Sequence, residues 1–536
     1  MDKRVYSVCL LMLVLGWAVG ARAFDLTILH TNDVHAALGG VQADGSPCYA
    51  AQCAGGAGGA VLLQQAVAAE RAAKKNCLLL DAGDQAQGTL FYSLFESEPS
   101  AKVMNILGYD AMVPGNHEFD NACAGFQKFS EQLDAPLVAA NMRYAEKYNP
   151  VPDYAPWVII ERSGRKIGIV GIITPETSTA SSPCTAVHFD DPVAALQKAV
   201  NALQARGVNI IIALTHYGIE HDKALANKVT GVDIIVGGHS HTLLSNKQSN
   251  AQGPYPVVEH SPSNQPVLVV TNVNGLRSLG VLDVTFDDAG KLVAWHGEPV
   301  LLVQQETQTP HAALAALLEE YAVGAQDLLH SPVGTIAAAL PKGQSLLEPD
   351  IRCCRQQECA TGNLVADALL WAGKADNAQF ALVNGGGLRS SLPVGMVTVG
   401  NIMATIPFDG DVVTGVVSGT VLKAALEQGL RRYAEGVGAF PQVAGLHIEA
   451  DIQRPAGKRL LSVRIAAADG SWQLIQDNST YRMITLDFLA QGGDGYAMLA
   501  TKQWRSVGKS TVAVVQAYLQ ACSPLRPRLE HRISVH

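Results

Sequence analysis

One repeated pattern constrains the first half of the sequence: a short apolar run, then a small or polar cluster, then a stretch with helical periodicity. The runs are β-branched or leucine-rich and glycines flank them, which is typical of buried strands. They are Leu26–Leu29, Leu78–Leu80, Ala111–Val113, Ile167–Ile173, Val208–Leu214 and Val232–Val236. Helical segments such as Ala60–Lys75 and Pro192–Arg206 alternate with them. This alternation predicts a layered α/β domain.

The pattern changes in the middle of the chain. Pro266–Asn272 and Ser278–Phe286 are adjacent strand-like runs, which predict an antiparallel portion that closes the first domain. Apolar residues from Leu314 to Leu329 then recur at helical spacing, with Pro332 after them. This predicted helix can be interpreted equally well as an ordinary packed helix or as a linker between domains. We therefore divide the chain into a leader at 1–23, a first domain at 24–308, a linker helix at 309–331 and a second domain at 332–536.

The first 23 residues have the form of a secretory signal. Basic residues at 3 and 4 precede an apolar run, and a small-residue cleavage site ends at Ala23. The run is too short to span a bilayer, and the C-terminus has no apolar tail for a lipid anchor. We therefore expect a periplasmic or secreted protein without a stable membrane anchor, present as a monomer or a homodimer.

Charge and size exclude further classes. The 536 residues contain 39 Lys and Arg against 48 Asp and Glu, a net charge of -9, and 48% of them are hydrophobic. Such a chain is too apolar to be disordered, and its length predicts at least two domains. Since no basic stripe appears, a nucleic acid polymer is not expected as a partner. A small anionic substrate remains possible, because it needs only a local cationic or metal-lined pocket.

The cysteines fit an exported protein but do not define a pairing. Cys9 lies in the leader, so nine remain, and an odd number leaves at least one thiol outside internal disulfides. Two local bridges are predicted, Cys48–Cys53 and Cys354–Cys359, each closing a short polar loop. Cys77, inside an apolar run, is interpreted as a buried free thiol.

Five polar clusters follow strand-like runs in the first half. The carboxyl ends of the strands in an α/β sheet line one crevice, so these clusters can converge. Carboxylate, imidazole and amide side chains without thiolates suit a dinuclear site for Zn, Mn, Co, Fe or, weakly, Mg. Singly, each cluster is more simply a loop cap or a surface pair, but five together favour a metal site. They are Asp33-Val34-His35, Asp81-Ala82-Gly83-Asp84, Gly115 to Asp120, Thr215-His216, and Gly237 to His241.

Within these clusters, two local geometries can be anticipated. Asp33 and His35, at i and i+2, point the same way if their segment is extended. Asp120 lies on the same face as His117 if a helix begins there, and can then fix the tautomer of His117. Asp84 is suited to bridge two ions.

The clusters resemble the calcineurin-type metallophosphoesterase signatures of the 5′-nucleotidases. The matching motifs are LTILHTNDVH, DAGDQAQGT, GNHEFD, THYG and GGHSHT. Their order and spacing are similar to those of the family over essentially the whole mature chain. The resemblance implies a four-layer α/β/β/α metallophosphoesterase domain, a linker helix and a C-terminal α/β nucleotide-binding domain. It also implies two divalent metal ions, Zn, Mn or Co, that activate water for attack on phosphorus. One ion is held by Asp33, His35, Asp84 and His241, and the other by Asp84, Asn116, His216 and His239, with His117 and Asp120 as a catalytic dyad.

The second half contains three further loop motifs. Asn384 to Arg389 read NGGGLR after a strand-like run, and glycines there let a backbone approach an anion that Arg389 can neutralise. Phe408 and Phe488 stand at loop positions, where two rings can clamp a planar base, although phenylalanine more often packs in a core. The resemblance implies that these rings sandwich the base, that Asp494 binds ribose hydroxyls, that Asn384 lies beside the base, and that Arg355 and Arg389 contact phosphate. Arg355 is placed by CRQQEC, which resembles a short disulfide loop of animal ecto-5′-nucleotidases.

These features favour an exported, metal-dependent enzyme that hydrolyses nucleoside 5′-monophosphates, AMP above all. The alternatives are a broader nucleotide hydrolase acting on UDP-sugars, NAD or 2′,3′-cyclic nucleotides, and a non-catalytic nucleotide-binding surface protein on the same scaffold. A related thiosulfate-releasing hydrolase is more remote because both aromatic residues and Asp494 are present. The resemblance also implies that one domain turns against the other to join the base and metal halves.

Overall fold

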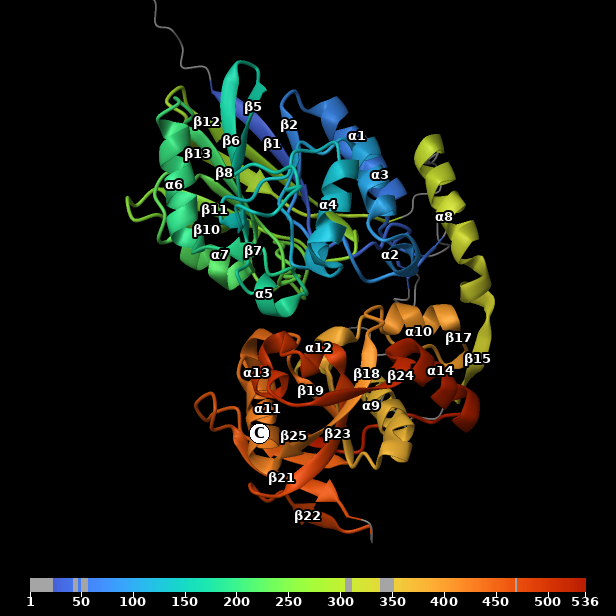
Figure 1. Cartoon of the computed structure of the whole chain (residues 1–536). Coiled ribbons are helices and arrows are strands. Elements are labelled where there is room, and N and C mark those ends of the chain that lie inside the picture. The colour runs from blue at the N-terminus through green and yellow to red at the C-terminus, as the bar shows by residue number, and fades with distance from the viewer. Residues whose placement is uncertain (1–22, 42–46, 50–55, 304–310, 338–350, 468–469) are drawn as a thin grey trace, which may run out of the picture.

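The chain folds into two layered bodies joined by one long helix. A computed structural model describes residues 23–41, 47–49, 56–303, 311–337, 351–467 and 470–536. The first body, blue to green in Figure 1, is stacked on the second, orange to red, and α8 runs along the side of the first. The predicted signal peptide lies outside the described residues except for Ala23.

The first body contains two six-stranded sheets. In one, β1, β2 and β3 are parallel, and β12 pairs antiparallel with β1. In the other, β6, β8, β9 and β11 are parallel, with antiparallel β5 and β10 at the edges. The first sheet consists of β13 (Leu292–Gly297), β12 (Ser278–Phe286), β1 (Phe24–Thr31), β2 (Cys77–Asp81), β3 (Ala111–Met112) and β14 (Val300–Leu301), which pairs with β12. The second consists of β10 (Val257–His260), β11 (Pro266–Val270), β9 (Ile234–Gly237), β8 (Ile210–His216), β6 (Arg165–Ile173) and β5 (Trp157–Arg162).

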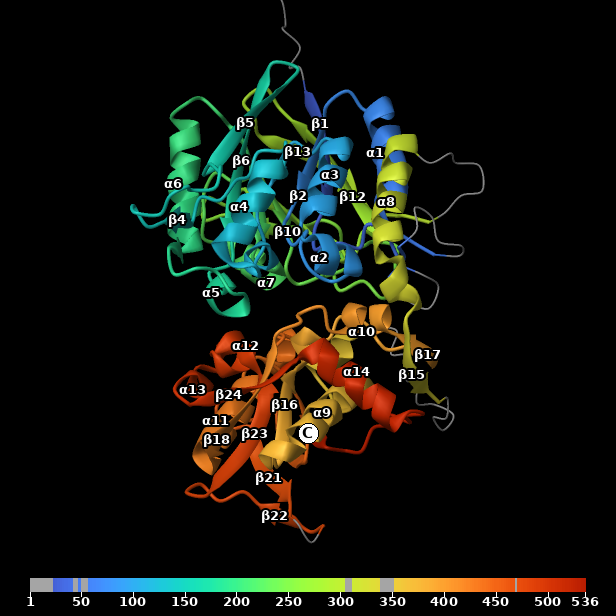
Figure 2. The ribbon, with the colours of Figure 1, turned by 45° about the vertical axis from the view of Figure 1, so that its right-hand side comes forward.

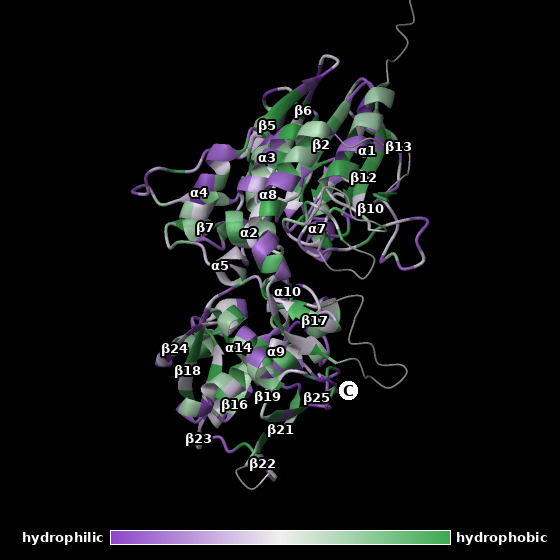
Figure 3. Ribbon diagram, turned by 90° about the vertical axis from the view of Figure 1, so that its right-hand side faces the viewer, coloured by the Kyte–Doolittle hydropathy of each residue, from purple (hydrophilic) through white to green (hydrophobic). Residues whose placement is uncertain are grey.

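Helices cover the outer face of each sheet, so the body has four layers. Between the sheets, Ile28 and Leu80 of the first pack in one core with Ile212 and Val236 of the second, all completely buried. Such runs are hydrophobic on both faces, which is typical of parallel strands buried between layers. Figure 3 shows green, hydrophobic strands such as β6 and β12 in the interior. The outer helices are α1 (Ala60–Ala73), α3 (Glu98–Leu107) and α4 (Ala122–Gln132) on the first sheet, and α6 (Pro192–Gln204) and α7 (Ile219–Ala226) on the second.

Three short elements complete the first body. They are α2 (Leu90–Phe95), α5 (Thr177–Ala180) and the pair β4 (Met142–Tyr144) with β7 (Val187–Phe189).

The predicted α/β alternation is confirmed, but one interpretation of its final portion is wrong. The runs that begin at Pro266 and Ser278 become β11 and β12, which belong to different sheets. β12 is antiparallel to β1 as expected, whereas β11 lies parallel to β9. The chain therefore crosses between the sheets at 271–277, and the two runs do not form one closing unit.

The long helix α8 (Ala312–His330) packs on the first body and leads directly into the second. Leu314, Leu318, Tyr321 and Ala325 form its buried stripe. Tyr321 meets the rings of Phe91 and Phe95, and its hydroxyl donates a hydrogen bond of 2.9 Å to Glu98. The helix is thus both a packed helix and a connection, as Figure 2 shows from a second side. No helix among the described residues is both long and apolar enough to cross a bilayer.

The second body is built on a five-stranded sheet covered on both faces. Alternate residues of β16 face opposite layers: Phe380 and Leu382 pack toward α11, while Ala381 and Val383 pack toward α9 and α14. In sheet order the strands are β19 (Pro441–Ala444), β16 (Phe380–Asn384), β23 (Thr480–Leu486), β18 (Asp411–Ser418) and β24 (Trp504–Ser510). The helices are α9 (Ala360–Ala372), α10 (Val399–Thr405), α11 (Gly419–Leu430), α12 (Asp487–Ala490), α13 (Ala497–Ala500) and α14 (Thr511–Cys522).

Two smaller sheets lie beside this one. A four-stranded sheet has the order β22 (Trp472–Leu474), β21 (Leu460–Ala466), β20 (Leu446–Ala450) and β25 (Ile533–Val535), and β15 (Pro332–Ile336) pairs with β17 (Gly395–Thr398).

The disulfides confirm one prediction and add a bridge that was not predicted. Cys354 and Cys359 are bonded as expected, and Cys123 of α4 is bonded to Cys184. Cys77 is a free thiol, although it is only half-buried. The predicted Cys48–Cys53 bridge lies outside the described residues because Cys53 is not among them.

We expect the Cys123–Cys184 bridge to stabilise the fold more than the local bridge does. It joins residues 61 apart, against 5 for Cys354–Cys359. Loop-closure entropy then predicts about 4 kcal/mol against about 2 kcal/mol, if native strain is equal. Thermal unfolding of Cys123→Ser/Cys184→Ser beside Cys354→Ser/Cys359→Ser checks this. A larger loss of melting temperature in the second variant would contradict it.

Candidate metal centre and active site

The predicted metal ligands converge where the parallel strands of both sheets end. Asp33 and His35 follow β1, Asp84 follows β2 and Asn116 follows β3, while His216 ends β8 and His239 and His241 follow β9. Carboxyl ends of parallel strands lie at the same edge of a sheet, and here two such edges face one another. The site is therefore one crevice, as expected, but strands of two sheets build it where the strands of one sheet were expected.

The ligand atoms lie close enough to share ions. His241 Nε2 is 3.2 Å from Asp33 Oδ1, and Asp84 Oδ2 is 3.2 Å from His216 Nε2 and 3.9 Å from His35 Nε2. Candidate cation-binding groups among the described residues are Asp33 with His35 and His241, Asp84 with His216 and His239, and His35 with Asp84 and His117. Asp84 occurs in two of them, as a bridging carboxylate requires.

Hydrogen bonds to backbone carbonyls determine which ring nitrogen of His35 and of His216 faces the candidate metal centre. His216 Nδ1 lies 2.7 Å from the carbonyl of Ala82, and His35 Nδ1 lies 3.2 Å from that of Ala86. A carbonyl only accepts, so each Nδ1 carries the proton and each Nε2 of a neutral ring presents a lone pair to the centre. His35 Nε2 faces His241 Nε2, and His216 Nε2 faces His239 Nδ1, both at 3.2 Å.

Asn116 supplies the observation that tests the fit of a metal. The residue is 3% exposed, and its side-chain Oδ1 has no hydrogen-bond partner among the described residues. A buried amide oxygen without a partner is costly in a protein interior. A cation beside Asp84 would satisfy it, so the residues present fit a divalent metal centre.

The backbone around the ligands differs from the extended segment that was expected. Asp33 and His35 have φ values of 50°, and Asp84, His239 and His241 also have positive φ. Residues other than glycine rarely adopt this region, and such positions concentrate at functional sites. Asp33 and His35 face the same centre because the chain turns there, and not because of strand alternation.

Glu118 is a site residue that sequence reasoning missed. It is buried, and its carboxylate accepts hydrogen bonds from the backbone N–H groups of Gly115 at 2.6 Å, Asp84 at 3.0 Å and Ala86 at 2.9 Å. It therefore joins the loop that carries Asp84 to the loop that carries Asn116. Burial raises the pKa of Glu118 to about 7. Its place inside GNHEFD was the available signal.

His117 and Asp120 form the expected pair. They lie at the two ends of the 3₁₀ helix η1 (His117–Phe119), and His117 Nδ1 is 2.7 Å from Asp120 Oδ2. The other oxygen of Asp120 accepts a 2.6 Å hydrogen bond from Ser181 Oγ. Burial lowers the pKa of His117, but the carboxylates of Asp120 and Asp84 outweigh burial and raise it above its usual value.

The predicted base-site residues lie at one edge of the second sheet. β16 and β23 are parallel, so Asn384 at the end of the first lies near Phe488 and Asp494, which follow the second. β18 runs antiparallel to β23 and begins at the same edge, just after Phe408. Asn384 Nδ2 donates to Asp494 Oδ2 at 2.7 Å, and burial raises the pKa of Asp494 above its usual value.

One cavity of about 600 Å³ connects the two halves. Arg389 Nη2 donates a 2.7 Å hydrogen bond to His117 Nε2, across the boundary between the bodies. The Arg389 guanidinium also lies 5.0 Å from the centre of the Phe408 ring, a cation–π contact. The cavity lining includes, from the first body, Asn116, His117, Asp120 and His239 and, from the second, Arg355, Asn384, Arg389, Phe408, Phe488 and Asp494.

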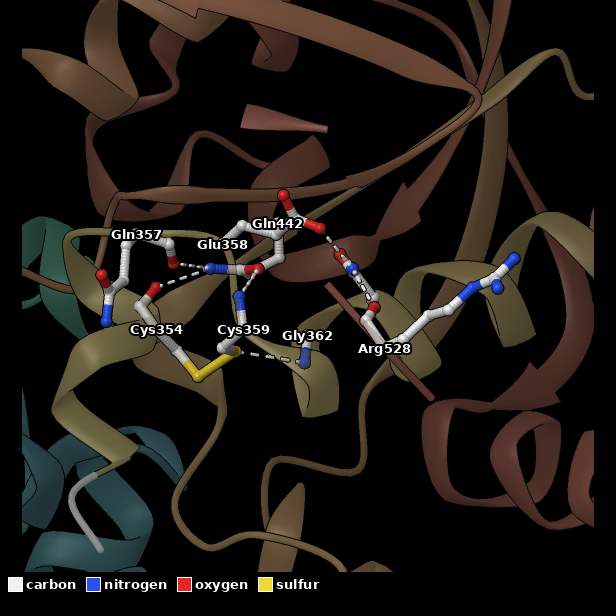
Figure 4. Close-up of a disulfide and its surroundings, with 8 residues drawn as sticks. Cys354, Gln357, Glu358, Cys359, Gly362, Gln442 and Arg528 are labelled. Carbon is white, nitrogen blue, oxygen red and sulfur yellow. Dashed lines mark hydrogen bonds between the residues drawn. A yellow bond between two sulfur atoms is a disulfide. The ribbon is translucent and has the colours of Figure 1, made fainter. Parts of the chain in front are cut away.

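Arg355 lies within the small loop that the Cys354–Cys359 disulfide closes, and Figure 4 shows the surroundings of this disulfide. Gln442, which is fully buried, donates to the carbonyls of Cys354 at 2.9 Å and Gln357 at 2.8 Å and accepts from the N–H of Cys359 at 3.1 Å. The NGGGLR loop packs directly on it, because a Cβ on Gly385 would approach the Cys354 carbonyl to 2.0 Å. The disulfide, Gln442 and the NGGGLR loop together hold the backbone at Arg355, which lines the same cavity as Asn384.

Two family models match the two bodies. A calcineurin-like phosphoesterase model matches residues 26–243, and a model described as the 5′-nucleotidase C-terminal domain matches residues 332–501. A 5′-nucleotidase of Diplobatis ommata is 34% identical, over 98% of this chain and 93% of the relative. The chain belongs to the 5′-nucleotidase family.

Two further similarities extend this result. A snake venom 5′-nucleotidase of Naja atra is 34% identical, over 95% of this chain and 98% of the relative. The crystal structure of a 5′-nucleotidase precursor from Thermus thermophilus covers 96% of this chain and 99% of its own, with a TM-score of 0.88 and 34% identity. This member of the family is thus a phosphoric monoester hydrolase that acts on nucleotides, and its family implies divalent metal ions.

Proposed function

We propose that this protein is an exported 5′-nucleotidase that releases phosphate from nucleoside 5′-monophosphates, with AMP as a preferred substrate, by a two-metal mechanism. The observation that supports this most is the cavity whose lining includes the candidate metal ligands Asn116 and His239 from the first body and the rings of Phe408 and Phe488 from the second. A nucleotide has a phosphate and a planar base at its two ends, and this cavity offers a partner for each.

Two divalent ions have suitable ligands in this chain. Asp33, His35, Asp84 and His241 would hold one, and Asp84, Asn116, His216 and His239 the other. The chemistry that such a pair supplies when bound is polarisation of the phosphoryl group and a water nucleophile at neutral pH. Oxygen and nitrogen ligands without thiolate suit Zn, Mn or Co.

The remaining polar groups of the cavity bind and orient the phosphoryl group. Arg389 Nε is buried and has no hydrogen-bond partner among the described residues. Arg389 and His117 now contact each other, and an anionic phosphoryl oxygen would be a stronger partner for both. Asp120 holds the His117 Nδ1 proton, so His117 Nε2 points to the substrate, where it can stabilise developing charge or protonate the leaving oxygen. Arg355 adds positive charge from the second body.

Residues of the second body bind the nucleoside part of the substrate. Phe408 and Phe488 stack on the base, Asp494 accepts from ribose hydroxyls, and Asn384 Oδ1, buried without a hydrogen-bond partner among the described residues, faces the base. Export is supported by the disulfides Cys123–Cys184 and Cys354–Cys359 and by the relative that is named as a venom protein.

Phe488→Ala is expected to raise KM for AMP by about tenfold or more, because one stacked face contributes about 1–3 kcal/mol. Steady-state kinetics with AMP checks this. Glycerol phosphate, which has no base, is the control, and its kcat/KM should stay close to that of the unaltered enzyme. An equal loss on both substrates would mean that Phe488 supports the fold and not the base.

The function itself is tested by phosphate and nucleoside release from AMP, UMP, ATP, UDP-glucose, NAD and 2′,3′-cyclic AMP. We expect the highest kcat/KM for AMP. A higher value for UDP-glucose, NAD or the cyclic nucleotide would replace the proposal with a broader nucleotide hydrolase. Absence of turnover with every metal added would favour a nucleotide-binding protein.

A further inference from the structure

The segment 174–184, between β6 and β7, has three contacts. It touches the His117–Asp120 pair, the end of β8 at His216, and the second body. Its central helix, α5, carries Glu176 at its N-terminal cap and Ser181 at its C-terminal cap. No motif singled out this segment, which is rich in serine and threonine and has the composition of an ordinary loop.

Ser181 contacts the pair directly. Its Oγ donates a 2.6 Å hydrogen bond to Asp120 Oδ1, while Asp120 Oδ2 is 2.7 Å from His117 Nδ1. The Ser181 side chain is 7% exposed. A carboxylate held at both oxygens cannot rotate about its Cβ–Cγ bond without breaking one of these contacts, so Ser181 fixes the plane in which Asp120 meets His117.

Both ends of the segment are anchored to the first body. The Thr174 N–H donates to the carbonyl of His216, a candidate metal ligand, at 2.8 Å. Cys184 is bonded to Cys123, three residues after Asp120 and in the first turn of α4. The disulfide therefore keeps the stretch with Ser181 next to the stretch with Asp120.

The middle of the segment reaches across to the second body. Glu176 Oε1 accepts a 2.5 Å hydrogen bond from Arg432 Nη1, and Arg432 is also bound by Glu435 on its own body. Helix α5 also packs against the 3₁₀ helix η6 (Gly493–Gly495), which carries Asp494. The same short segment thus contacts the second body through Glu176 and helix α5, and contacts Asp120 through Ser181.

We propose that Ser181 is a positioning residue for the His117–Asp120 pair, and that the Glu176–Arg432 ion pair makes this positioning depend on contact between the two bodies. The inference rests on the proposed function, since it assigns His117 to the reaction. When the bodies separate, the segment loses its contact with Arg432 and η6, and Asp120 loses a fixed partner. Catalytic geometry is then complete only when both halves of the nucleotide site are together.

Ser181→Ala tests the first step. Its kcat for AMP is expected to fall about tenfold with KM nearly unchanged, as for other residues that orient a reacting group through a second one. Ser181→Thr keeps the hydroxyl and should recover most of kcat. Ser178→Ala removes an exposed hydroxyl from the same helix and is the matched control, with wild-type kinetics and melting temperature.

A double-mutant cycle separates positioning from general damage. In an Asp120→Ala background, Ser181→Ala should change kcat by less than about twofold, because the group it positions is absent. An equal tenfold loss in both backgrounds would overturn the proposal, as would wild-type kcat in Ser181→Ala. Failure of the proposed function is distinguishable, because the unaltered enzyme would then either release no phosphate from any nucleotide or prefer UDP-glucose, NAD or the cyclic nucleotide to AMP.

Glu176→Gln tests the dependence on domain contact. We expect kcat/KM to fall about threefold at low salt, and added salt to shrink the difference from wild type, as for a partly exposed ion pair. Asp190→Asn removes the exposed pair with Arg143, which lies within the first body, and should have no effect. Equal kinetics of Glu176→Gln and wild type at low salt would overturn the link to domain contact.

Discussion

His117→Ala is expected to lower kcat for AMP by about 10²–10⁴-fold while KM rises only a few-fold, because a positioned acid–base group acts mainly in the transition state. His117 has the geometry for this role: Asp120 holds Nδ1 at 2.7 Å, and Nε2 meets Arg389 in the cavity. Steady-state kinetics with AMP measures the effect. A loss that appears only in KM would assign His117 to substrate binding.

The leaving group decides which of its two roles His117 performs. If it protonates the leaving oxygen, His117→Ala should lose much less activity on p-nitrophenyl phosphate, whose leaving group needs no proton at neutral pH. If it stabilises charge on the phosphoryl group, the loss should be similar for both substrates. Asn121→Ala, next to the same 3₁₀ helix, is a control for local damage and should keep kcat within about twofold.

Removal of metal is the second large effect. Prolonged treatment with a chelator is expected to lower turnover of AMP by at least about 100-fold, because the polarising charge at the phosphate is lost. Zn, Mn or Co added back singly should restore it, and the metal that restores most defines the preference. Measurement by atomic emission should give two ions per chain in the restored enzyme.

Asn116→Ala sharpens the same prediction. The buried Oδ1 of Asn116 has no other partner among the described residues, so its loss should reduce metal content toward one ion per chain. Asn141→Ala is not a suitable control, because that amide bridges backbone groups of β6 and the loop at 190. Asn201→Ala, which removes an exposed amide of α6 that accepts a hydrogen bond from the side chain of Gln197, is preferable. Full activity after exhaustive metal removal would contradict the two-metal mechanism.

Many of the candidate site residues could be predicted because they lie in short contiguous sequence motifs. GNHEFD and GGHSHT each place candidate ligands within a few residues of a strand end, so the α/β pattern alone brought each motif to the carboxyl edge of its sheet, and the two edges face one another. The same reason applies to Asn384, Phe408 and Phe488, which we propose to bind the base, since each adjoins a strand of one sheet.

What escaped prediction depends on contacts between distant segments. Nothing near Ser181 indicates that it meets Asp120, and the pairing of Cys123 with Cys184 is one of many that nine cysteines allow. The placement of β11 and β12 in separate sheets follows from a crossing of seven residues that carries no strong signal. Sheet membership and disulfide pairing are set by packing over the whole domain, and a local pattern does not contain that information.

All seven candidate metal ligands lie between residues 33 and 241. Strand β12, which pairs with β1 in the first sheet, comes later in the chain and ends at Phe286. During synthesis from the N-terminus, the loops that carry the candidate ligands emerge first, but the first sheet is incomplete until β14 ends at Leu301, 60 residues after His241. The second body begins later still, after α8. We therefore expect the nascent chain to bind its metals before any nucleotide site exists, so that metal supply acts on the folding of the first domain and not on the assembly of the whole enzyme.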